Sequence, residues 1–389
     1  MILTIASGKG GTGKTTLAVN LTEFLMNSSS IKENIRLLDC DVEAPNDNLF
    51  IKASPTSGKR ITIRKPVWNK EKCKACGKCK EVCRYNAIAK ISKEILIFKD
   101  LCHSCGGCKY ICPNDAITEE EYSIGEVYAT PVNQKLLFAY GLLNIGKTTT
   151  PSMVKAVKSY ISLDGLNIID APPGTGCSVV STLEGSDIAI LVTEPTPFGL
   201  HDLKLALELA NKMKIPTGVV INRSDGNDNI ILDFLNKYDI PVLGRIPFDR
   251  KYAEAYSRGE MLIHSFPEIE DKISKIFAVA LELKDKKVKQ YTTHGMNELN
   301  YTKSQKNISE STKAKNRQKE IMIISGKGGT GKTTITAALS VLAKRELNNN
   351  RVFADCDVDA ADLHLLLKPE IIKKSEFSGG SVYKIDSKT

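Results

Sequence analysis

The sequence predicts an α/β fold with a mainly parallel, doubly wound sheet into which a small cysteine-rich α+β domain is inserted. Short apolar runs alternate with helical segments from residue 2 to residue 283, the order that covers both faces of a parallel sheet with helices. A glycine-rich loop directly follows the first apolar run. Eight of the 11 cysteines fall within residues 73–112, which marks that stretch as a separate unit.

These features divide the chain into four parts. The sheet domain is split over residues 1–67 and 119–283, and we expect the insert at residues 68–118 to interrupt a surface loop without touching the core. Residues 284–319 hold ten Lys or Arg and three acidic residues, so they predict a basic polar linker that is disordered. Residues 320–389 begin a second, truncated copy of the sheet domain.

The first apolar run, Ile2–Ala6, predicts a buried strand that leads into a phosphate-binding loop. The loop matches G-x-x-x-x-G-K-S/T and precedes a helical segment at Leu17–Met26, which is the context of a P-loop NTPase. Lys14 should reach the β- and γ-phosphates and Thr15 should ligate Mg²⁺. The predicted cofactors are therefore ATP and Mg²⁺. The loop residues expected to hold them are Gly8, Gly10, Gly11, Thr12, Gly13, Lys14, Thr15 and Thr16.

Lys9 opens the run Lys9-Gly10-Gly11, and here the chain resembles the MinD/ParA/nitrogenase-iron-protein superfamily of P-loop ATPases, which has a deviant Walker A motif. The resemblance implies that Lys9 crosses a dimer interface to the nucleotide of the partner. It therefore implies an ATP-dependent face-to-face homodimer, or a heterodimer with a related ATPase. Without the resemblance, Lys9 would be an ordinary solvated loop lysine.

Three further motifs follow in the order of this superfamily. The stretch that begins at Asp39 and Asp41 resembles D-x-D-x-x-x-P-N, which implies that Asp39 lies near Mg²⁺ and that Asp41 orients the attacking water. Asp170 ends an apolar strand and fits the magnesium shell of a loop that senses the γ-phosphate. Asn222 matches the asparagine that hydrogen-bonds adenine. The expected catalytic residues are Lys9, Lys14, Asp41 and Asp170. Without the resemblance, the Asp39 stretch would be a surface turn.

Residues 73–112 contain two cysteine runs of identical spacing, Cys73-x2-Cys76-x2-Cys79-x3-Cys83 and Cys102-x2-Cys105-x2-Cys108-x3-Cys112. This spacing resembles that of bacterial two-cluster ferredoxins, in which the fourth cysteine of each run ligates the other cluster. The resemblance implies two [4Fe–4S] clusters, one on Cys73, Cys76, Cys79 and Cys112, the other on Cys102, Cys105, Cys108 and Cys83. A disulfide framework would need an oxidising compartment, and zinc sites use pairs of thiolates rather than two ordered quartets.

Composition limits the setting and the partners. No run approaches the ~18 apolar residues of a membrane helix, and residues 1–6 lack the basic region of a signal peptide. We therefore expect a cytoplasmic protein without an integral membrane segment. The net charge of +9 is concentrated in residues 284–319, so no nucleic acid partner is expected.

Two features of charge and thiol placement leave alternatives open. Twelve Lys or Arg oppose two Glu between residues 59 and 93. This basic face of the insert either docks an acidic redox protein or cluster acceptor, or is a solvated face that offsets the charge of the clusters. Cys177 stands at the offset of the cysteine that ligates a shared cluster in the nitrogenase iron protein. The alternative for Cys177 is a small buried thiol.

The chain then repeats itself. Residues 321–334 restate residues 3–16, and Asp355-Cys356-Asp357 restates the Asp39 motif. The repeat offers a second phosphate loop but no counterpart of the cysteine runs, of Asp170 or of Asn222. A truncated tandem domain, an incomplete gene model and a frameshifted fusion all fit this pattern. The residues of the second loop are Gly328, Gly329, Thr330, Gly331, Lys332, Thr333 and Thr334.

Together the motifs predict an iron–sulfur protein that hydrolyses Mg-ATP and couples nucleotide-driven dimerisation to electron transfer or metallocluster assembly. One alternative is a positioning ATPase like MinD or ParA, whose clusters are structural or sensory. The other is an iron–sulfur cluster carrier or scaffold, for which Cys177 is the candidate ligand of a transferable cluster at the dimer interface.

Overall fold

The structure is a computed structural model of the chain. It describes residues 1–53, 57–147 and 149–284, and from the second copy residues 321–323, 331–346, 352–356, 363–367 and 369. The expected linker beyond residue 284 lies outside the described residues, as do Gly328, Gly329 and Thr330 of the second phosphate loop.

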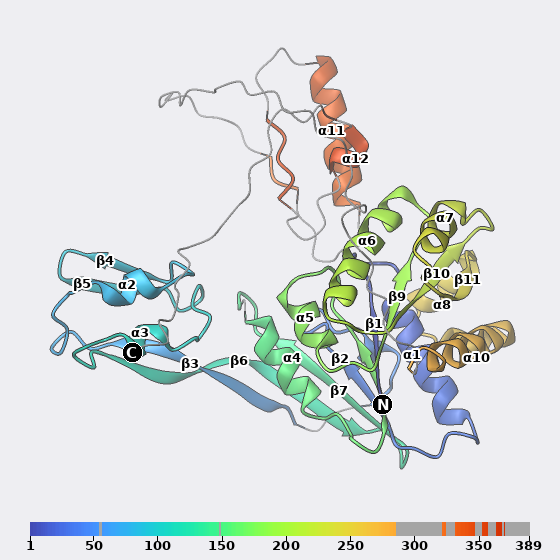
Figure 1. Ribbon diagram of the computed structural model, residues 1–389, viewed down its shortest axis with the longest axis horizontal. Coiled ribbons are helices and arrows are strands. Elements are labelled where there is room, and N and C mark those ends of the chain that lie inside the picture. The colour runs from blue at the N-terminus through green and yellow to red at the C-terminus, as the bar shows by residue number, and fades with distance from the viewer. Residues whose placement is uncertain are drawn as a thin grey trace.

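A nine-stranded sheet forms the centre of the protein, in the order β11-β10-β9-β1-β8-β2-β7-β6-β3 (Figure 1). The strands from β11 to β7 pair in parallel, whereas β6 runs antiparallel to both β7 and β3. The mainly parallel α/β fold expected from the sequence is confirmed. The strands are β1 (Ile2–Ala6), β2 (Ile35–Asp39), β3 (Lys59–Trp68), β6 (Ile117–Pro131), β7 (Leu136–Leu143), β8 (Leu166–Asp170), β9 (Ile188–Thr193), β10 (Thr217–Ser224) and β11 (Val242–Pro247).

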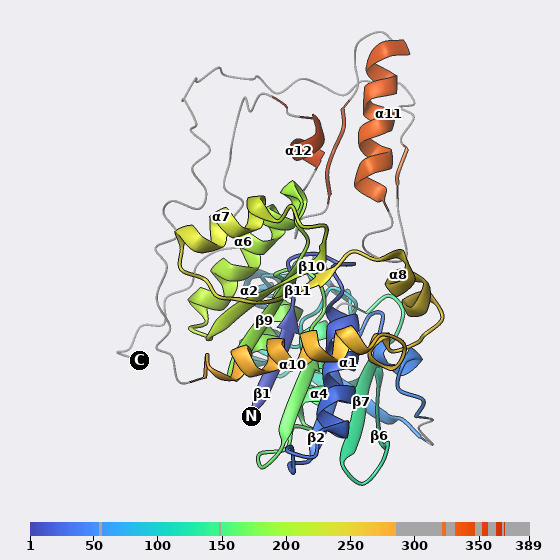
Figure 2. The same ribbon diagram turned by 90° about the vertical axis from the view of Figure 1, so that its right-hand side faces the viewer.

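Helices cover both faces of the sheet (Figures 1 and 2). One hydrophobic cluster joins Leu3 and Ile5 of β1 to the helices of the first face, and two others join Ala6 and Ile169 to those of the second. Neighbouring strand residues point to opposite faces, so Ile5 and Ala6 belong to different clusters. The first face carries α1 (Lys14–Asn27), α8 (Arg250–Ser257), α9 (Leu262–Ser265) and α10 (Pro267–Leu281); the second carries α4 (Thr150–Lys158), α5 (Cys177–Leu183), α6 (Pro197–Lys212) and α7 (Asn229–Lys237).

The cysteine-rich insert continues directly from the edge of this sheet. Residues 125–131 of β6 pair with β7, whereas residues 117–123 pair with β3 alone, out to Trp68 opposite Ile117. The sequence led us to expect an insertion in a surface loop. In the structure, β3 and β6 instead extend beyond the edge of the sheet as a two-stranded ribbon. This ribbon continues the hydrogen-bonded ladder of the sheet into the insert. The ribbon carries α2 (Lys78–Val82), β4 (Ile88–Ile91), β5 (Glu94–Ile97) and α3 (Gly107–Tyr110).

The described part of the second copy repeats helices of the first but not its strands, because residues 321–323 and 352–356, which correspond to parts of β1 and β2, form no strand. Helix α11 (Lys332–Glu346) corresponds to α1, and α12 (Leu363–Leu367) corresponds to the short 3₁₀ helix η1 (Asp47–Leu49). Gly331 has a φ of 93° and Gly13 one of 97°, a left-handed conformation that glycine adopts without steric cost. No helix among the described residues is both long and apolar enough to cross a membrane.

Candidate functional site

A cavity of about 1020 Å³ opens at the carboxyl ends of the central strands, where α/β sheets bind their ligands. The carbonyl of Gly13 accepts the N–H of Leu17 at 3.0 Å, so the phosphate loop leads straight into the N-terminus of α1. That terminus supplies free N–H groups and a positive dipole end to an anion. Six loop residues line the cavity: Gly10, Gly11, Gly13, Lys14, Thr15 and Thr16.

Two residues that the sequence assigned to this loop have other surroundings. A Cβ added to Gly8 would lie 2.1 Å from the carbonyl oxygen of Asp202, so Gly8 permits close packing against α6. Thr12 is 7% exposed, and its hydroxyl has no hydrogen-bond partner among the described residues. Neither Gly8 nor Thr12 is among the residues that line the cavity.

Lys14 and Asp41 lie together at the cavity wall. The Lys14 side chain is buried, and its Nζ donates to the hydroxyl of Ser7 at 3.1 Å. Burial raises the pKa of Asp41 to about 6, although the positive charge of Lys14 acts in the opposite direction. The structure thus brings the expected phosphate-binding lysine and water-orienting carboxylate to one site.

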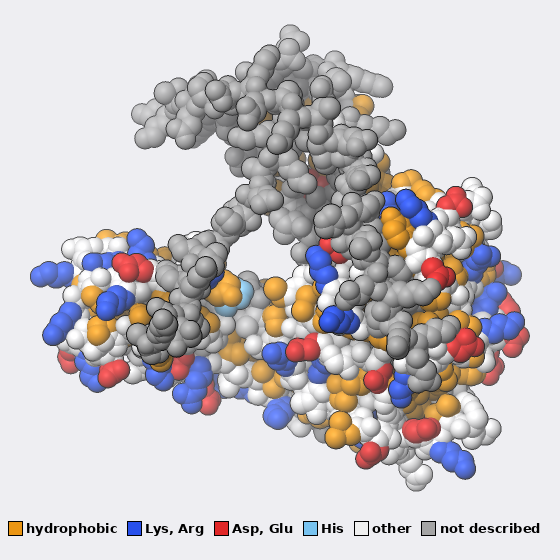
Figure 3. Space-filling view, viewed as in Figure 1, with side chains coloured by type: hydrophobic (Ala, Val, Ile, Leu, Met, Phe, Trp, Pro, Cys, Tyr) orange, Lys and Arg blue, Asp and Glu red, His pale blue; other side chains and the backbone are white. Residues whose placement is uncertain are grey.

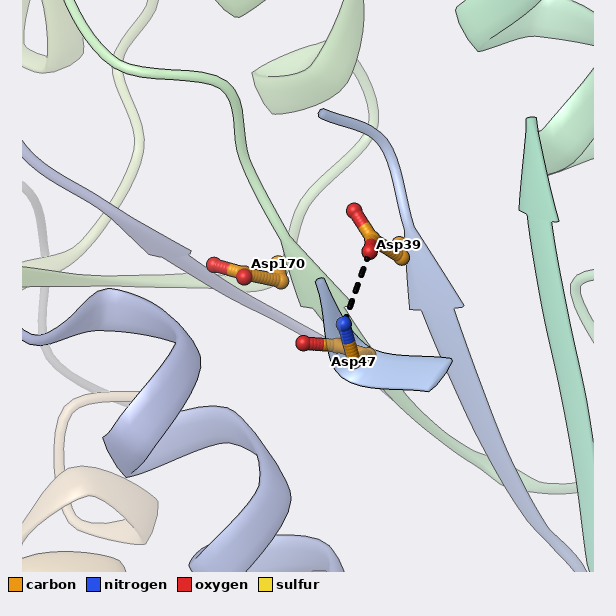
Figure 4. A group of neighbouring side chains, drawn as sticks. All are labelled: Asp39, Asp47 and Asp170. Carbon is orange, nitrogen blue, oxygen red and sulfur yellow. Dashed lines mark hydrogen bonds between the residues drawn. The ribbon is translucent and has the colours of Figure 1, made fainter. Parts of the chain in front are cut away.

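Three buried carboxylates meet behind the loop (Figure 4). Oxygen atoms of Asp39, Asp47 and Asp170 lie within 4.8 Å of one another. Thr15 adjoins them, because its Oγ1 donates to Oδ2 of Asp170 at 2.6 Å. Burial, followed by the charge of the neighbouring carboxylates, raises the pKa of Asp39 and of Asp47 well above the usual range. The group therefore favours a bound cation or a shared proton.

The carboxylates of Asp39 and Asp47 differ in the hydrogen bonds that they accept. Asp39 accepts the N–H groups of Asp41 (3.0 Å), Asn46 (2.9 Å) and Asp47 (3.1 Å), so it shapes the loop that carries Asp41. The carboxylate oxygens of Asp47 have no hydrogen-bond donor among the described residues and face the carboxylate of Asp170. Carboxylate oxygens together with the hydroxyl of Thr15 are a donor set that fits Mg²⁺.

Sequence reasoning missed Asp47. A signal was available in the repeat, because Leu363 follows Asp355 by the same eight residues that separate Asp47 from Asp39. A carboxylate that replaces a leucine at a buried position indicates a role beyond packing.

Lys9 is not among the residues that line this cavity. Its Nζ lies 5.5 Å from the centre of the Phe198 ring, and its backbone carbonyl accepts the hydroxyl of Ser7 at 2.6 Å. Burial raises the pKa of Glu194, while the charges of Arg223 and then Lys9 lower it. The ammonium group of Lys9 therefore lies near Phe198 and Glu194 at the rim of the site.

Asn222 comes from the end of β10 and contacts the phosphate loop itself. Its Nδ2 donates to the carbonyl of Thr12 at 2.7 Å, and a Cβ on Gly13 would lie 2.2 Å from the same nitrogen. Asn222 also lines the cavity, beside a group of apolar and aromatic side chains that form the side expected for the base. These are Ile246, Pro247, Phe248, Tyr252 and Tyr256.

The eight cysteines of the insert surround two small cavities. Each cavity combines three cysteines of one run with the fourth cysteine of the other run, as the ferredoxin resemblance implies. The first site consists of Cys73, Cys76, Cys79 and Cys112. The second site consists of Cys83, Cys102, Cys105 and Cys108.

The two sites repeat the same backbone geometry. Ala75 and Ser104 are left-handed, with φ of 54° and 57°, and their N–H groups donate to the sulfurs of Cys73 and Cys102 at 3.3 and 3.4 Å. Each cavity is also lined by one residue whose buried donor has no hydrogen-bond partner among the described residues: Trp68, through Nε1, at the first and Ser104, through Oγ, at the second. Four thiols and a spare donor fit an anionic iron–sulfur cluster.

Two further cysteines line the nucleotide cavity. Cys40 is fully buried next to Asp39, and burial raises the pKa of its thiol well above the usual value. Cys177 is exposed at the start of α5. The expectation of a small buried thiol at position 177 is therefore wrong, since the side chain is accessible at the mouth of the cavity.

The family model described as the CobQ/CobB/MinD/ParA nucleotide binding domain matches residues 3–263 and 321–378. An uncharacterised protein of Methanocaldococcus jannaschii is 32% identical, over 68% of this chain and 91% of its own length. An iron–sulfur cluster carrier protein of Aquifex aeolicus is 26% identical, over 71% of this chain and 65% of its own.

Among solved structures, the septum site-determining protein MinD of Pyrococcus horikoshii, complexed with Mg-ADP, is similar to this chain at 19% identity and a TM-score of 0.44. The match covers 73% of this chain and 98% of that one. The family model covers most of the chain and includes the phosphate loop, the Asp39 motif, Asp170 and Asn222. The chain therefore belongs to the CobQ/CobB/MinD/ParA nucleotide-binding family of P-loop ATPases.

Proposed function

We propose that this ATPase works as a dimer and uses its nucleotide cycle to control two [4Fe–4S] clusters held by the insert, for electron transfer or metallocluster assembly. The observation that carries the proposal is the sorting of eight cysteines into two quartets on a ribbon that belongs to the nucleotide-binding sheet. When bound, such clusters supply one-electron chemistry at low potential. The hydrogen-bonded ladder that joins β7, β6 and β3 gives the nucleotide site a physical route to the insert.

The nucleotide site would act through a few side chains. Lys14 would hold the terminal phosphates, and Asp41 on the same wall would orient the attacking water. Thr15 and the buried carboxylates around Asp170 would hold Mg²⁺. Lys9 does not line the cavity of its own subunit, which supports its use in the site of a partner subunit.

The first cysteine site lies within a basic surface that suits an acidic redox partner. Cys76 is exposed, and Lys and Arg side chains occur around much of the outline of the insert in Figure 3. Opposite charge at such a surface speeds the encounter of two proteins and orients them. The exposed basic residues in this loop are Lys70, Lys72, Lys74, Lys78, Lys80 and Arg84.

The proposal is tested by following electron delivery under anaerobic conditions. The reduced full-length protein is mixed with an oxidised low-potential acceptor, and the rate is measured without nucleotide, with Mg-ADP and with Mg-ATP. We expect Mg-ATP to change the rate at least tenfold, and the Lys14→Ala variant to lose that response because it no longer holds the phosphates. If the rate of electron delivery is the same without nucleotide, with Mg-ADP and with Mg-ATP, in protein that hydrolyses ATP, the proposal is contradicted.

The alternative function is iron–sulfur cluster delivery. It is favoured by the exposure of Cys177 at the nucleotide cavity and by the printed name of the Aquifex aeolicus relative. The same reaction mixture separates the two functions, because iron can be counted in an apo-acceptor after repurification. Transfer of iron that is lost in Cys177→Ser and retained in Cys76→Ser would favour delivery over electron transfer.

A further inference from the structure

The segment of described residues 144–147, 149 and 150 joins the nucleotide site to the cysteine-rich insert. At its start, the N–H of Leu143 donates to the carbonyl of Val42 at 2.8 Å, and Val42 lines the nucleotide cavity next to Asp41. At its end, Thr150 begins α4 and lines the same cavity. Both ends of the segment are therefore anchored at the nucleotide site.

The middle of this segment contacts the insert through Lys147. The Nζ of Lys147 lies 2.9 Å from Oδ1 of Asp100 and 4.6 Å from the centre of the Tyr122 ring. Lys147 also donates to the hydroxyl of Tyr122, which in turn donates to Asp100 at 3.0 Å. These three side chains form a closed triangle, and Asp100 stands two residues before Cys102 of the second cysteine site.

A second lysine ties Cys102 to the same tyrosine. Lys65 on β3 is 1% exposed, and its Nζ donates to the backbone carbonyl of Cys102. The same nitrogen lies 5.6 Å from the centre of the Tyr122 ring. Tyr122 is thus shared by Lys65, which holds the second cysteine loop, and by Lys147, which belongs to the nucleotide-binding sheet domain.

Apolar packing runs alongside these polar contacts. One hydrophobic cluster contains Cys40 and Val42 at the nucleotide site together with Leu143 and Ile124, and Tyr122 packs against it. The N–H of Asn144 donates to the carbonyl of Ile124 at 2.8 Å. Packed interiors transmit displacement because they contain little free space.

We propose that Lys147 is a positioning residue that transmits the nucleotide state to the second cysteine site, formed by Cys83, Cys102, Cys105 and Cys108, in preference to the first. The proposal rests on the proposed function and names which of its two sites responds. Nucleotide contacts at Asp41–Val42 and Thr150 shift residues 144–147, and Lys147 carries that shift to Asp100. The displaced ammonium group changes both the order of the Asp100–Cys105 loop and the charge beside it.

The insert provides its own matched comparison. Glu71 stands two residues before Cys73, as Asp100 stands two residues before Cys102, but the ion pair of the first loop joins Lys70 to Glu94 within the insert. Glu71→Gln and Asp100→Asn therefore remove one carboxylate from equivalent positions of the two loops. Only the second of these carboxylates is held by Lys147.

The test is hydrogen exchange on the full-length, cluster-loaded protein under anaerobic conditions, with Mg-ADP or with a non-hydrolysable Mg-ATP analogue. We expect the exchange rate of residues 99–105 to differ at least threefold between the two nucleotides, and that of residues 70–76 to differ less than 1.5-fold. Lys147→Met and Asp100→Asn should abolish the difference. Lys147→Arg and Glu71→Gln should keep it, and ATP hydrolysis should stay within twofold of the parent in all four.

The outcomes separate this inference from the proposed function. An absent response at residues 99–105, an equal response in both loops, or a full response in Lys147→Met overturns the role of Lys147. A response that depends on Lys147 supports it, even if electron delivery proves insensitive to nucleotide and the proposed function fails. Where both hold, the second site alone should change its reduced-to-oxidised ratio at fixed potential, by threefold or more, and Lys147→Met should remove that change.

Discussion

The backbone N–H of Asp47 donates to the carboxylate of Asp39 at 3.1 Å, and the N–H of Leu363 donates to Asp355 at 2.9 Å in the second copy. The loop therefore forms with either aspartate or leucine at this position, because only the backbone is needed. The side chain of Asp47 is nevertheless fully buried against Asp39 and Asp170. The Asp47 carboxylate therefore contributes negative charge to the site and is not required for the loop to fold.

Replacing Asp47 by Leu or Asn should stabilise the protein in the absence of Mg²⁺. Removing a buried carboxylate without a donor removes its desolvation cost and its repulsion of Asp39 and Asp170, an expected gain of about 1–3 kcal/mol in the free energy of unfolding. Mg²⁺ should then stabilise the variants less than the parent. Chemical denaturation with EDTA or Mg²⁺ measures both effects. The exposed Asp233→Asn is the control, and loss of stability in EDTA would count against this account.

Lys9→Ala and Lys14→Ala should separate nucleotide binding from dimerisation. Lys9 does not line the nucleotide cavity, so Lys9→Ala should bind a fluorescent ATP analogue within about threefold of the parent. We expect it to lose the ATP-dependent dimer and at least about 90% of hydrolysis, a barrier increase of more than about 1.4 kcal/mol. Lys14→Ala should lose binding as well. Light scattering and nucleotide titration distinguish the two, and a Lys9→Ala dimer with normal turnover contradicts the assigned role.

Ser104→Ala and Trp68→Phe should each lower the midpoint potential of one cysteine site when its cluster is bound. Ser104→Ala removes the buried donor of the second site, and Trp68→Phe removes that of the first. Each variant leaves the donor of the other site in place, so the two variants serve as controls for each other. Hydrogen bonds to cluster sulfurs stabilise the reduced form. Loss of one such hydrogen bond should lower the midpoint potential of a one-electron couple by on the order of 20–60 mV. Potentiometric EPR measures the shift, and equal shifts at both sites in one variant would be inconsistent with this assignment.

Gly8→Ala should destabilise the fold before it affects phosphate binding directly. The added Cβ would lie 2.1 Å from the carbonyl of Asp202, so α6 must move, at a cost of about 1–3 kcal/mol. Thermal unfolding without nucleotide should show this loss. Equal stability of the variant and the parent would mean that Gly8 acts through the phosphates, as the sequence motif implies.

The fold was largely predictable because its signals are local. Alternating apolar runs and helical segments indicate a parallel sheet, and a glycine loop between a strand and a helix indicates where its ligand binds. The attachment of the insert was not predictable in this way. From sequence, the residues of β3 and β6 were expected only to flank a surface loop. Their place in the sheet depends on pairing between residues that lie far apart in sequence, such as Lys59 with Val127.

The candidate site was predictable to a lesser extent. Motif residues such as Lys14, Asp41 and Asn222 meet at one cavity, as expected. Asp47 was missed because an aspartate within a run of Asn and Asp resembles a solvated turn, and only burial reveals its charge. Lys147 was missed because its contacts with Asp100 and Tyr122 arise from the ribbon geometry, which no local pattern encodes.

The most direct test of the central claim is a potentiometric EPR titration of the full-length, cluster-loaded protein without nucleotide, with Mg-ADP and with a non-hydrolysable Mg-ATP analogue. If the nucleotide cycle controls the clusters, the midpoint potential of the second cysteine site should shift by on the order of 30 mV or more between the two nucleotides, about a threefold change in its reduced-to-oxidised ratio at fixed potential. Identical potentials in all three conditions, in protein that hydrolyses ATP normally, would contradict the claim.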